Sequence, residues 1–169
     1  MLRTVLAVAV PLAGAAGALA QEPWQRPMNR QIIGKWSVSA EEDRFGDGTR
    51  TRAELKQGRH LMAVDCHERG PGLPPWLTIR VAGHFVYGDL YKVKVRVDTR
   101  PVVDTPAFGA SERFIEISRP QRLVKQMMDG REIAFRVVGG NRTVDTVFQL
   151  GQAGLALADV AVACPLDRR

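Results

Sequence analysis

The clearest strand pattern in the sequence is YKVKVRVD, residues 91–98. Valine alternates with charged residues along it, and a period of two is typical of a strand with one buried and one exposed face. We expect the valines to face a core and the opposite row to expose three cations, Lys92, Lys94 and Arg96. The stretch therefore predicts a sheet that is covered on one side only.

Similar runs of apolar and β-branched residues continue on both sides of this stretch. Glycine, proline and aspartate separate them, as is typical of turns. Residues 101–110 contain two prolines and are predicted to form a long connection. About nine strands are predicted, at residues 33–39, 51–56, 60–66, 76–81, 84–87, 91–98, 112–117, 131–138 and 144–150.

The period changes to that of a helix at residues 123–128, where apolar side chains recur at helical spacing. Ser118 followed by Gln121 is typical of a capping box, and Gly130 is expected to end this helix. A second short helix is predicted at residues 154–164, where alanines dominate. Together these elements predict a mainly β fold, an antiparallel β-sandwich or barrel-like domain with two short α-helices.

The start of the chain predicts export. Residues 1–20 combine a positive charge at Arg3, an apolar run and small residues up to Ala20, the three parts of a secretory signal peptide. The polar residues 21–31 are expected to be an extended leader, and residues 32–169 a single β-rich domain. No later apolar run is long enough to span a membrane, so we expect a mature chain without a membrane span, periplasmic or secreted.

The chain contains two cysteines, Cys66 and Cys164, which are 98 positions apart. Export leads to an oxidising compartment in which two cysteines normally pair, so we predict a disulfide between them. In the chain-entropy model such a cross-link contributes up to about 4.7 kcal/mol to stability. A redox-active thiol is the alternative, but no C-x-x-C motif supports it.

The sequence lacks the motifs of several catalytic classes. It contains neither G-x-S-x-G nor S-x-x-K, which serine hydrolases use, and no glycine-rich loop for phosphate binding. Asp65, His67 and His84 are the candidates for a metal site, since the first two share one face of a predicted strand. A metal-dependent cell-wall hydrolase is therefore an alternative. The primary interpretation is a protein without a catalytic site, metal or cofactor.

The charge balance favours anionic partners, because the formal net charge is +6 at pH 7. The row of Lys92, Lys94 and Arg96 is a candidate anion-binding face, and an ordinary solvated sheet face is the alternative. Basic residues are not interleaved with aromatic ones, so no nucleic-acid partner is predicted.

Several short stretches match one protein family in order along the chain. LVKQMMDGREIAFRV, residues 123–137, matches a helix of the F-I-K-Q-L kind that runs into a strand of the L-x-V-R-V kind. The other matches are WSVS at residues 36–39, the first-cysteine strand at 61–66, VRVD at 95–98, TVFQL at 146–150 and the terminal Cys164. In these motifs the chain resembles the periplasmic VasI/TagO type of type VI secretion-associated proteins, or a wider group of exported single-disulfide β-domains.

This resemblance implies a β-domain with an accessory role in the cell envelope and no defined active site. We therefore predict a non-catalytic exported protein that binds an envelope protein or an anionic cell-envelope polymer, as a type VI secretion accessory. Two alternatives stay open. One is the hydrolase with Asp65, His67 and His84, and the other is a carrier that binds a small ligand in the mouth of a β-barrel.

Overall fold

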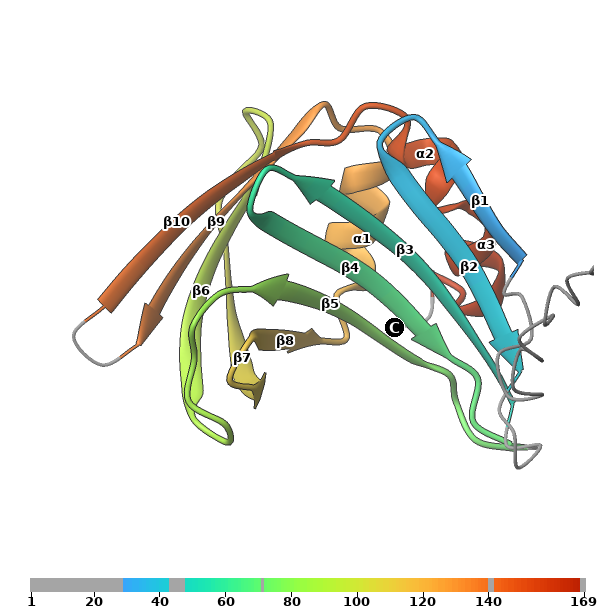
Figure 1. The fold of residues 1–169 in the computed structure, drawn as a ribbon, viewed down its shortest axis with the longest axis horizontal. Coiled ribbons are helices and arrows are strands. Elements are labelled where there is room, and N and C mark those ends of the chain that lie inside the picture. The colour runs from blue at the N-terminus through green and yellow to red at the C-terminus, as the bar shows by residue number, and fades with distance from the viewer. Residues whose placement is uncertain (1–28, 43–47, 71, 140–141, 168–169) are drawn as a thin grey trace, which may run out of the picture.

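The computed structural model of the protein describes residues 29–42, 48–70, 72–139 and 142–167. The predicted signal peptide and residues 21–28 of the predicted leader lie outside these ranges. The described residues form ten strands and three short helices (Figure 1). The prediction of a mainly β fold with a few short helices is confirmed.

The ten strands of the described residues belong to one antiparallel sheet. Their bounds are β1 Asn29–Ile33, β2 Trp36–Glu42, β3 Thr49–Gln57, β4 His60–His67, β5 Trp76–Ala82, β6 Leu90–Val97, β7 Val103–Ser111, β8 Phe114–Ser118, β9 Glu132–Gly139 and β10 Arg142–Gln149. Their order in the sheet is β1-β2-β3-β4-β5-β8-β7-β6-β9-β10. A sandwich requires two sheets, whereas these strands form one curved sheet (Figure 1). Of the two predicted architectures, the structure therefore corresponds to the barrel-like one.

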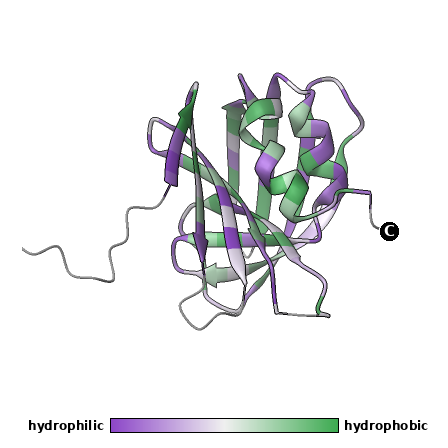
Figure 2. Ribbon diagram, turned by 90° about the vertical axis from the view of Figure 1, so that its right-hand side faces the viewer, coloured by the Kyte–Doolittle hydropathy of each residue, from purple (hydrophilic) through white to green (hydrophobic). Residues whose placement is uncertain are grey.

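The helices are α1 Gln121–Met128, α2 Ala153–Ala156 and α3 Ala158–Ala163. They lie on one side of the sheet, which we call its inner face: α1 against β6, α2 against β2, and α3 against β3 and β4. Apolar and polar stretches alternate along them, as expected for helices that bury one side (Figure 2). None of the described helices has the length and apolar character that crossing a membrane requires.

Alternation along the strands separates this inner face from an outer face. β6 follows the predicted pattern, since Val93, Val95 and Val97 are buried while the charged residues between them are exposed. Residues directly opposite each other in neighbouring strands lie on the same face, so the register extends both faces across the sheet. The largest fully buried side chains are those of Trp36, Phe135, Phe148, Leu55, Met62, Ile79, Ile115, Ile117, Met127, Ile133, Leu150 and Leu157.

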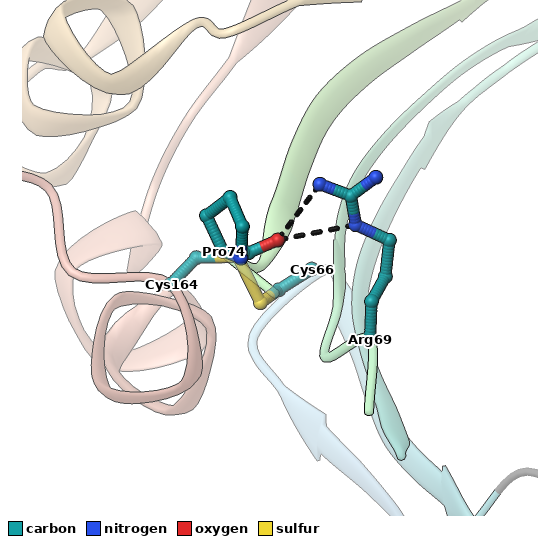
Figure 3. Close-up of a disulfide and its surroundings, with 4 residues drawn as sticks. All are labelled: Cys66, Arg69, Pro74 and Cys164. Atoms are coloured by element: carbon teal, nitrogen blue, oxygen red, sulfur yellow. Dashed lines mark hydrogen bonds between the residues drawn. A yellow bond between two sulfur atoms is a disulfide. The ribbon is translucent and has the colours of Figure 1, made fainter. Parts of the chain in front are cut away.

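A disulfide joins Cys66 to Cys164, with Cα atoms 5.8 Å apart, and this confirms the predicted pair. Cys66 lies on the inner face near the end of β4, and Cys164 directly follows α3. In the connection between β4 and β5, the Arg69 guanidinium donates hydrogen bonds of 2.9 and 3.1 Å to the Pro74 carbonyl (Figure 3). The bridge and this loop contact together fix the end of β4.

Hydrogen bonds also connect β2 and β3 with the end of β10, although β10 is at the opposite edge of the sheet. The Trp36 indole donates a 2.7 Å hydrogen bond to the Leu150 carbonyl, and both groups are buried. The Gln57 side chain exchanges hydrogen bonds of 2.6 and 3.1 Å with the Gln149 backbone. The sheet therefore curves enough to bring its two halves together at one end.

Two predictions in the middle of the chain, one of a strand and one of a connection, were wrong. Residues 84–87 do not form a strand, because Phe85 turns inward and packs edge-on against Tyr91, with ring centroids 5.3 Å apart. The predicted connection at residues 101–110 is mostly strand β7, despite Pro106. β8 pairs with β7 only from Phe108 onward, so the missing N–H of the proline interrupts no hydrogen bond there.

Smaller corrections concern the ends of elements. The last residues of the predicted leader belong to β1. Gly34, with φ +59°, lies in the turn that connects β1 to β2. The predicted strand 33–39 is therefore split by this turn. The predicted capping box is absent: Pro120 is the N-cap of α1 and Ser118 ends β8. The predicted helix at residues 154–164 is divided into α2 and α3 at Leu157.

Candidate functional site

A cluster of charged side chains lies on the outer face of β3, β4, β5 and β8. The register builds it: Asp65 of β4 is opposite Arg52 of β3, and Arg80 of β5 is opposite Glu116 of β8. We call this set the charged cluster, and its members are Arg50, Arg52, Glu54, Asp65, Arg80 and Glu116.

Asp65 is the centre of the charged cluster. Arg50 donates hydrogen bonds of 3.0 Å from Nε and 2.8 Å from Nη2 to Asp65 Oδ1. The Nε atoms of Arg52 and Arg80 lie 3.8 and 3.9 Å from the Asp65 carboxylate, which are ion-pair distances but too long for hydrogen bonds. Arg80 instead donates a 2.9 Å hydrogen bond to Glu116.

Both acids at the centre of the charged cluster are buried, with Asp65 exposed by 4% and Glu116 by 5%. A buried carboxylate is stable only if cations and hydrogen bonds compensate its charge. The three arginines balance Glu54, Asp65 and Glu116, yet Asp65 Oδ2 is without a hydrogen-bond partner among the described residues. Arginines therefore hold the Asp65 carboxylate in place, and Oδ2 itself is closed off from solvent.

A cavity of about 340 Å³ opens beside Asp65. Trp76 forms one side of it, is 38% exposed, and is covered by the Arg69 guanidinium at 5.3 Å from the ring centroid. The lining residues are Glu41, Glu42, Arg50, Asp65, His67, Trp76, Thr78 and Arg80. The arrangement combines fixed donors, exposed carboxylates at the rim and an exposed aromatic ring, which are the components of a polar binding site.

A larger depression of about 570 Å³ lies beside β1 and β2, lined by Asn29, Arg30, Gln31, Val38, Ser39, Ala40, Thr51 and Asp159. The charged side chains in its lining, Arg30 and Asp159, are exposed. It therefore lacks a buried charged group that would select a ligand, and we regard the cavity at Asp65 as the better candidate despite its smaller volume.

The predicted anion-binding row, Lys92, Lys94 and Arg96, is exposed on the outer face of β6, far along the sheet from Asp65. With Arg136, which is opposite Lys94 on β9, it forms what we call the basic strip. Lys94 lies 3.8 Å from Asp104, and Arg136 donates hydrogen bonds of 2.8 and 2.9 Å to Asp145.

The Arg136 contact has an electrostatic consequence. Its hydrogen bond and positive charge lower the pKa of the Asp145 carboxyl below its ordinary value, and the contact raises the pKa of Arg136. Two of the four cations in the basic strip thus already have an acidic neighbour. Anion binding by Lys92, Lys94 and Arg96 stays a prediction.

The predicted metal trio is not brought together. His67 is opposite Trp76 at the start of β5, whereas His84 follows the end of the same strand, so the two histidines lie at opposite ends of β5. Among the described residues, no group of three or more His, Cys, Asp or Glu side chains is placed to hold a metal ion. Asp65 is held by arginines instead.

Sequence reasoning identified Asp65 but missed Arg50, Arg80 and Glu116. Each of the three is a charged residue at an alternate position of a strand, which in sequence looks like an ordinary solvent-facing residue. Glu116 between Ile115 and Ile117 was the one local signal, because a charge inside an apolar run needs a partner. The partner itself depends on strand order.

Comparisons with known proteins give a fold but no family. No family model and no curated protein matches the chain. A solved structure, the crystal structure of invasion associated protein B from Bartonella henselae, is similar with a TM-score of 0.52 and 12% sequence identity. The match covers 79% of this chain and 96% of that one. It supports the fold alone, and the resemblance to the VasI/TagO type stays a prediction.

Proposed function

We propose that this chain is a non-catalytic exported protein that binds a component of the cell envelope through the charged cluster. The observation that carries the proposal is the cavity at Asp65, whose lining combines arginines held by buried carboxylates with a partly exposed tryptophan. The side chains of Arg50 and Arg80 are each 35% exposed, so their remaining N–H groups can donate to a ligand in the cavity.

The surroundings of Asp65 support binding. The strands hold the polar side chains in fixed positions, and the disulfide fixes β4 one residue further on, at Cys66. Sites that are organised before the ligand arrives lose less entropy on binding. The disulfide also supports export, because such bonds persist in oxidising compartments.

A role as a type VI secretion accessory is the finer part of the proposal, and the sequence motifs are its support. The genes that surround the coding gene test it directly. We expect components of the secretion apparatus among them, and their consistent absence would remove this part while leaving the binding function in place. No observation on the described residues favours the hydrolase or the small-ligand carrier, so neither is proposed.

A capture experiment tests the binding function. The immobilised protein is incubated with envelope extract, and its enrichment pattern is compared with those of Trp76→Ala and Asp65→Asn. We expect the enriched component to be lost with both variants. Tyr87→Ala and Arg136→Ala are matched controls, since Tyr87 is an exposed aromatic in another loop and Arg136 is a paired arginine of the basic strip. Equal enrichment by all five proteins would contradict the proposal.

A further inference from the structure

We infer that the cavity at Asp65 binds a neutral saccharide, a short segment of an envelope glycan. This inference rests on the proposed function and specifies the ligand of the same site. It is carried by three properties of the cavity: its charge balance, its unused hydrogen-bonding groups and its aromatic wall.

The charge balance favours a neutral ligand. The three arginines of the charged cluster are matched by three carboxylates. At the rim, the exposed Glu41 and Glu42 are opposed by Arg69 over Trp76, so four arginines face five carboxylates and the site is close to neutral. An anion would have to approach these two glutamates. A cation would have to approach three arginines. A neutral group that can donate and accept meets neither penalty.

The unused hydrogen-bonding groups alternate between acceptor and donor. At the rim, the exposed carboxylates of Glu41 and Glu42 are acceptors. Arg80 makes its hydrogen bond to Glu116 through Nε, which leaves its terminal N–H groups directed elsewhere. Adjacent hydroxyls on a sugar ring each donate and accept. One hydroxyl can therefore donate to a rim glutamate while its neighbour accepts from Arg80.

Trp76 supplies the apolar contact that a sugar ring requires. The C–H groups on one side of a pyranose form an apolar surface that packs against an aromatic face. The indole borders the cavity and keeps 38% of its surface exposed, which is unusual for a side chain of this size. Arg69 lies over the ring, and the indole N–H is 3.5 Å from Glu116, so the ring is held in place.

The volume limits the length of the ligand. At about 340 Å³, the cavity is near the lower end of the range for small-molecule sites, roughly 300–1,000 Å³. It accommodates a short segment, and the rest of a longer glycan would extend over the outer face. The exposed residues Val86, Tyr87 and Leu90 form another surface candidate, but nothing there selects a partner.

Nuclear magnetic resonance on the full chain with its disulfide formed tests the inference. The probes are tetrasaccharides of N-acetylglucosamine, glucose and xylose, together with tetraglutamate and tetralysine peptides as charged alternatives. The readout is the indole N–H signal of Trp76, assigned with Trp76→Phe. We expect at least one neutral tetrasaccharide to shift this signal in a saturable way below about 10 mM, a weak but specific affinity.

Variants locate the binding. Trp76→Ala and Asp65→Asn should each weaken saccharide binding at least about tenfold, equal to about 1.4 kcal/mol. For Trp76→Ala, the backbone amide signals of β4 and β5 replace the lost indole signal. Tyr87→Ala should change the affinity less than about twofold. If Asp65→Asn unfolds, as a thermal melt would show, Trp76→Ala alone decides the result.

Three results would overturn the inference. The first is that no neutral tetrasaccharide shifts the Trp76 signal, and the second is that a charged peptide binds in preference. The third is saccharide binding that both variants leave unchanged. If the saccharides fail while envelope capture still depends on Trp76 and Asp65, the proposed function stands with a different ligand. Failure of both experiments would reject both proposals.

Discussion

The outer face of the sheet holds two regions of paired charges that differ mainly in burial. In the charged cluster, Asp65 and Glu116 are each exposed by 5% or less. In the basic strip, the acidic partners Asp104 and Asp145 have side chains that are 74% and 56% exposed. Both regions are assembled by strand register, and both use short contacts between acids and cations.

This contrast shows that the distance within an ion pair does not by itself predict how much the pair contributes to stability. An exposed pair gains little, because water and salt screen the charges and two long side chains lose freedom. Breaking a buried pair costs much more, because it leaves a charge in a poorly solvated place. The charged cluster should therefore matter for stability and binding, and the basic strip mainly for surface charge.

The largest expected effect tests whether the disulfide supports the half of the sheet that contains the charged cluster. Replacing both Cys66 and Cys164 by alanine should lower the free energy of unfolding by up to about 4.7 kcal/mol, because the closed loop is long. Chemical denaturation under non-reducing conditions measures it, with the reduced wild type as control. A change below about 1 kcal/mol in the free energy of unfolding would show that packing against the helices holds β4 in place without the disulfide.

The next effect compares the two regions directly. Asp65→Ala should destabilise the protein by about 2 kcal/mol, since three partly exposed arginines lose the buried carboxylate that they surround and the Arg50 hydrogen bonds are lost. Asp145→Ala removes an equally short contact from the basic strip and should leave the denaturation midpoint unchanged within error. Urea denaturation of the two variants in the same buffer gives the difference. Equal destabilisation would show that burial is not what separates the regions.

Much of the fold was predictable from local patterns, and much of the site was not. The alternation in β6 and the cysteine pair led to a covered sheet with one disulfide, as the structure has it. β7 was missed because a proline inside a strand is acceptable only where no neighbour needs its N–H, and strand order decides that. Likewise, Glu116 joins Arg80 only because β8, 36 residues later, is the neighbour of β5.

A third prediction concerns the point where the two halves of the sheet meet. Trp36→Phe keeps the aromatic ring but removes the indole donor, which leaves the buried Leu150 carbonyl without that 2.7 Å hydrogen bond. We expect a loss of about 1.5 kcal/mol in the free energy of unfolding. Amide hydrogen exchange in β2 and β10 provides a second measurement, and it should increase in both strands. Faster exchange in only one of them would mean that the halves open separately.

The smallest expected effect concerns the pH dependence of the basic strip. The Arg136 hydrogen bond lowers the pKa of Asp145. A carboxyl with a lowered folded-state pKa stabilises the fold at pH values above its unfolded-state pKa, and this contribution is lost as the pH falls through the folded-state pKa. In Arg136→Gln the pKa of Asp145 should rise toward its ordinary value, as a carboxyl-carbon titration by nuclear magnetic resonance would show.

Salt gives the matching control for this last prediction. Because both side chains of the Arg136–Asp145 pair are more than half exposed, high ionic strength should move the wild-type pKa of Asp145 upward, in the same direction as the substitution. The Arg50–Asp65 hydrogen bonds, in contrast, end on a buried carboxylate and should persist in the same salt. If neither Arg136→Gln nor high salt changes the pKa of Asp145, the exposed pair is not formed in solution. The two regions would then differ in a simpler way, since the charged cluster would contain formed ion pairs and this part of the basic strip only unpaired surface charges.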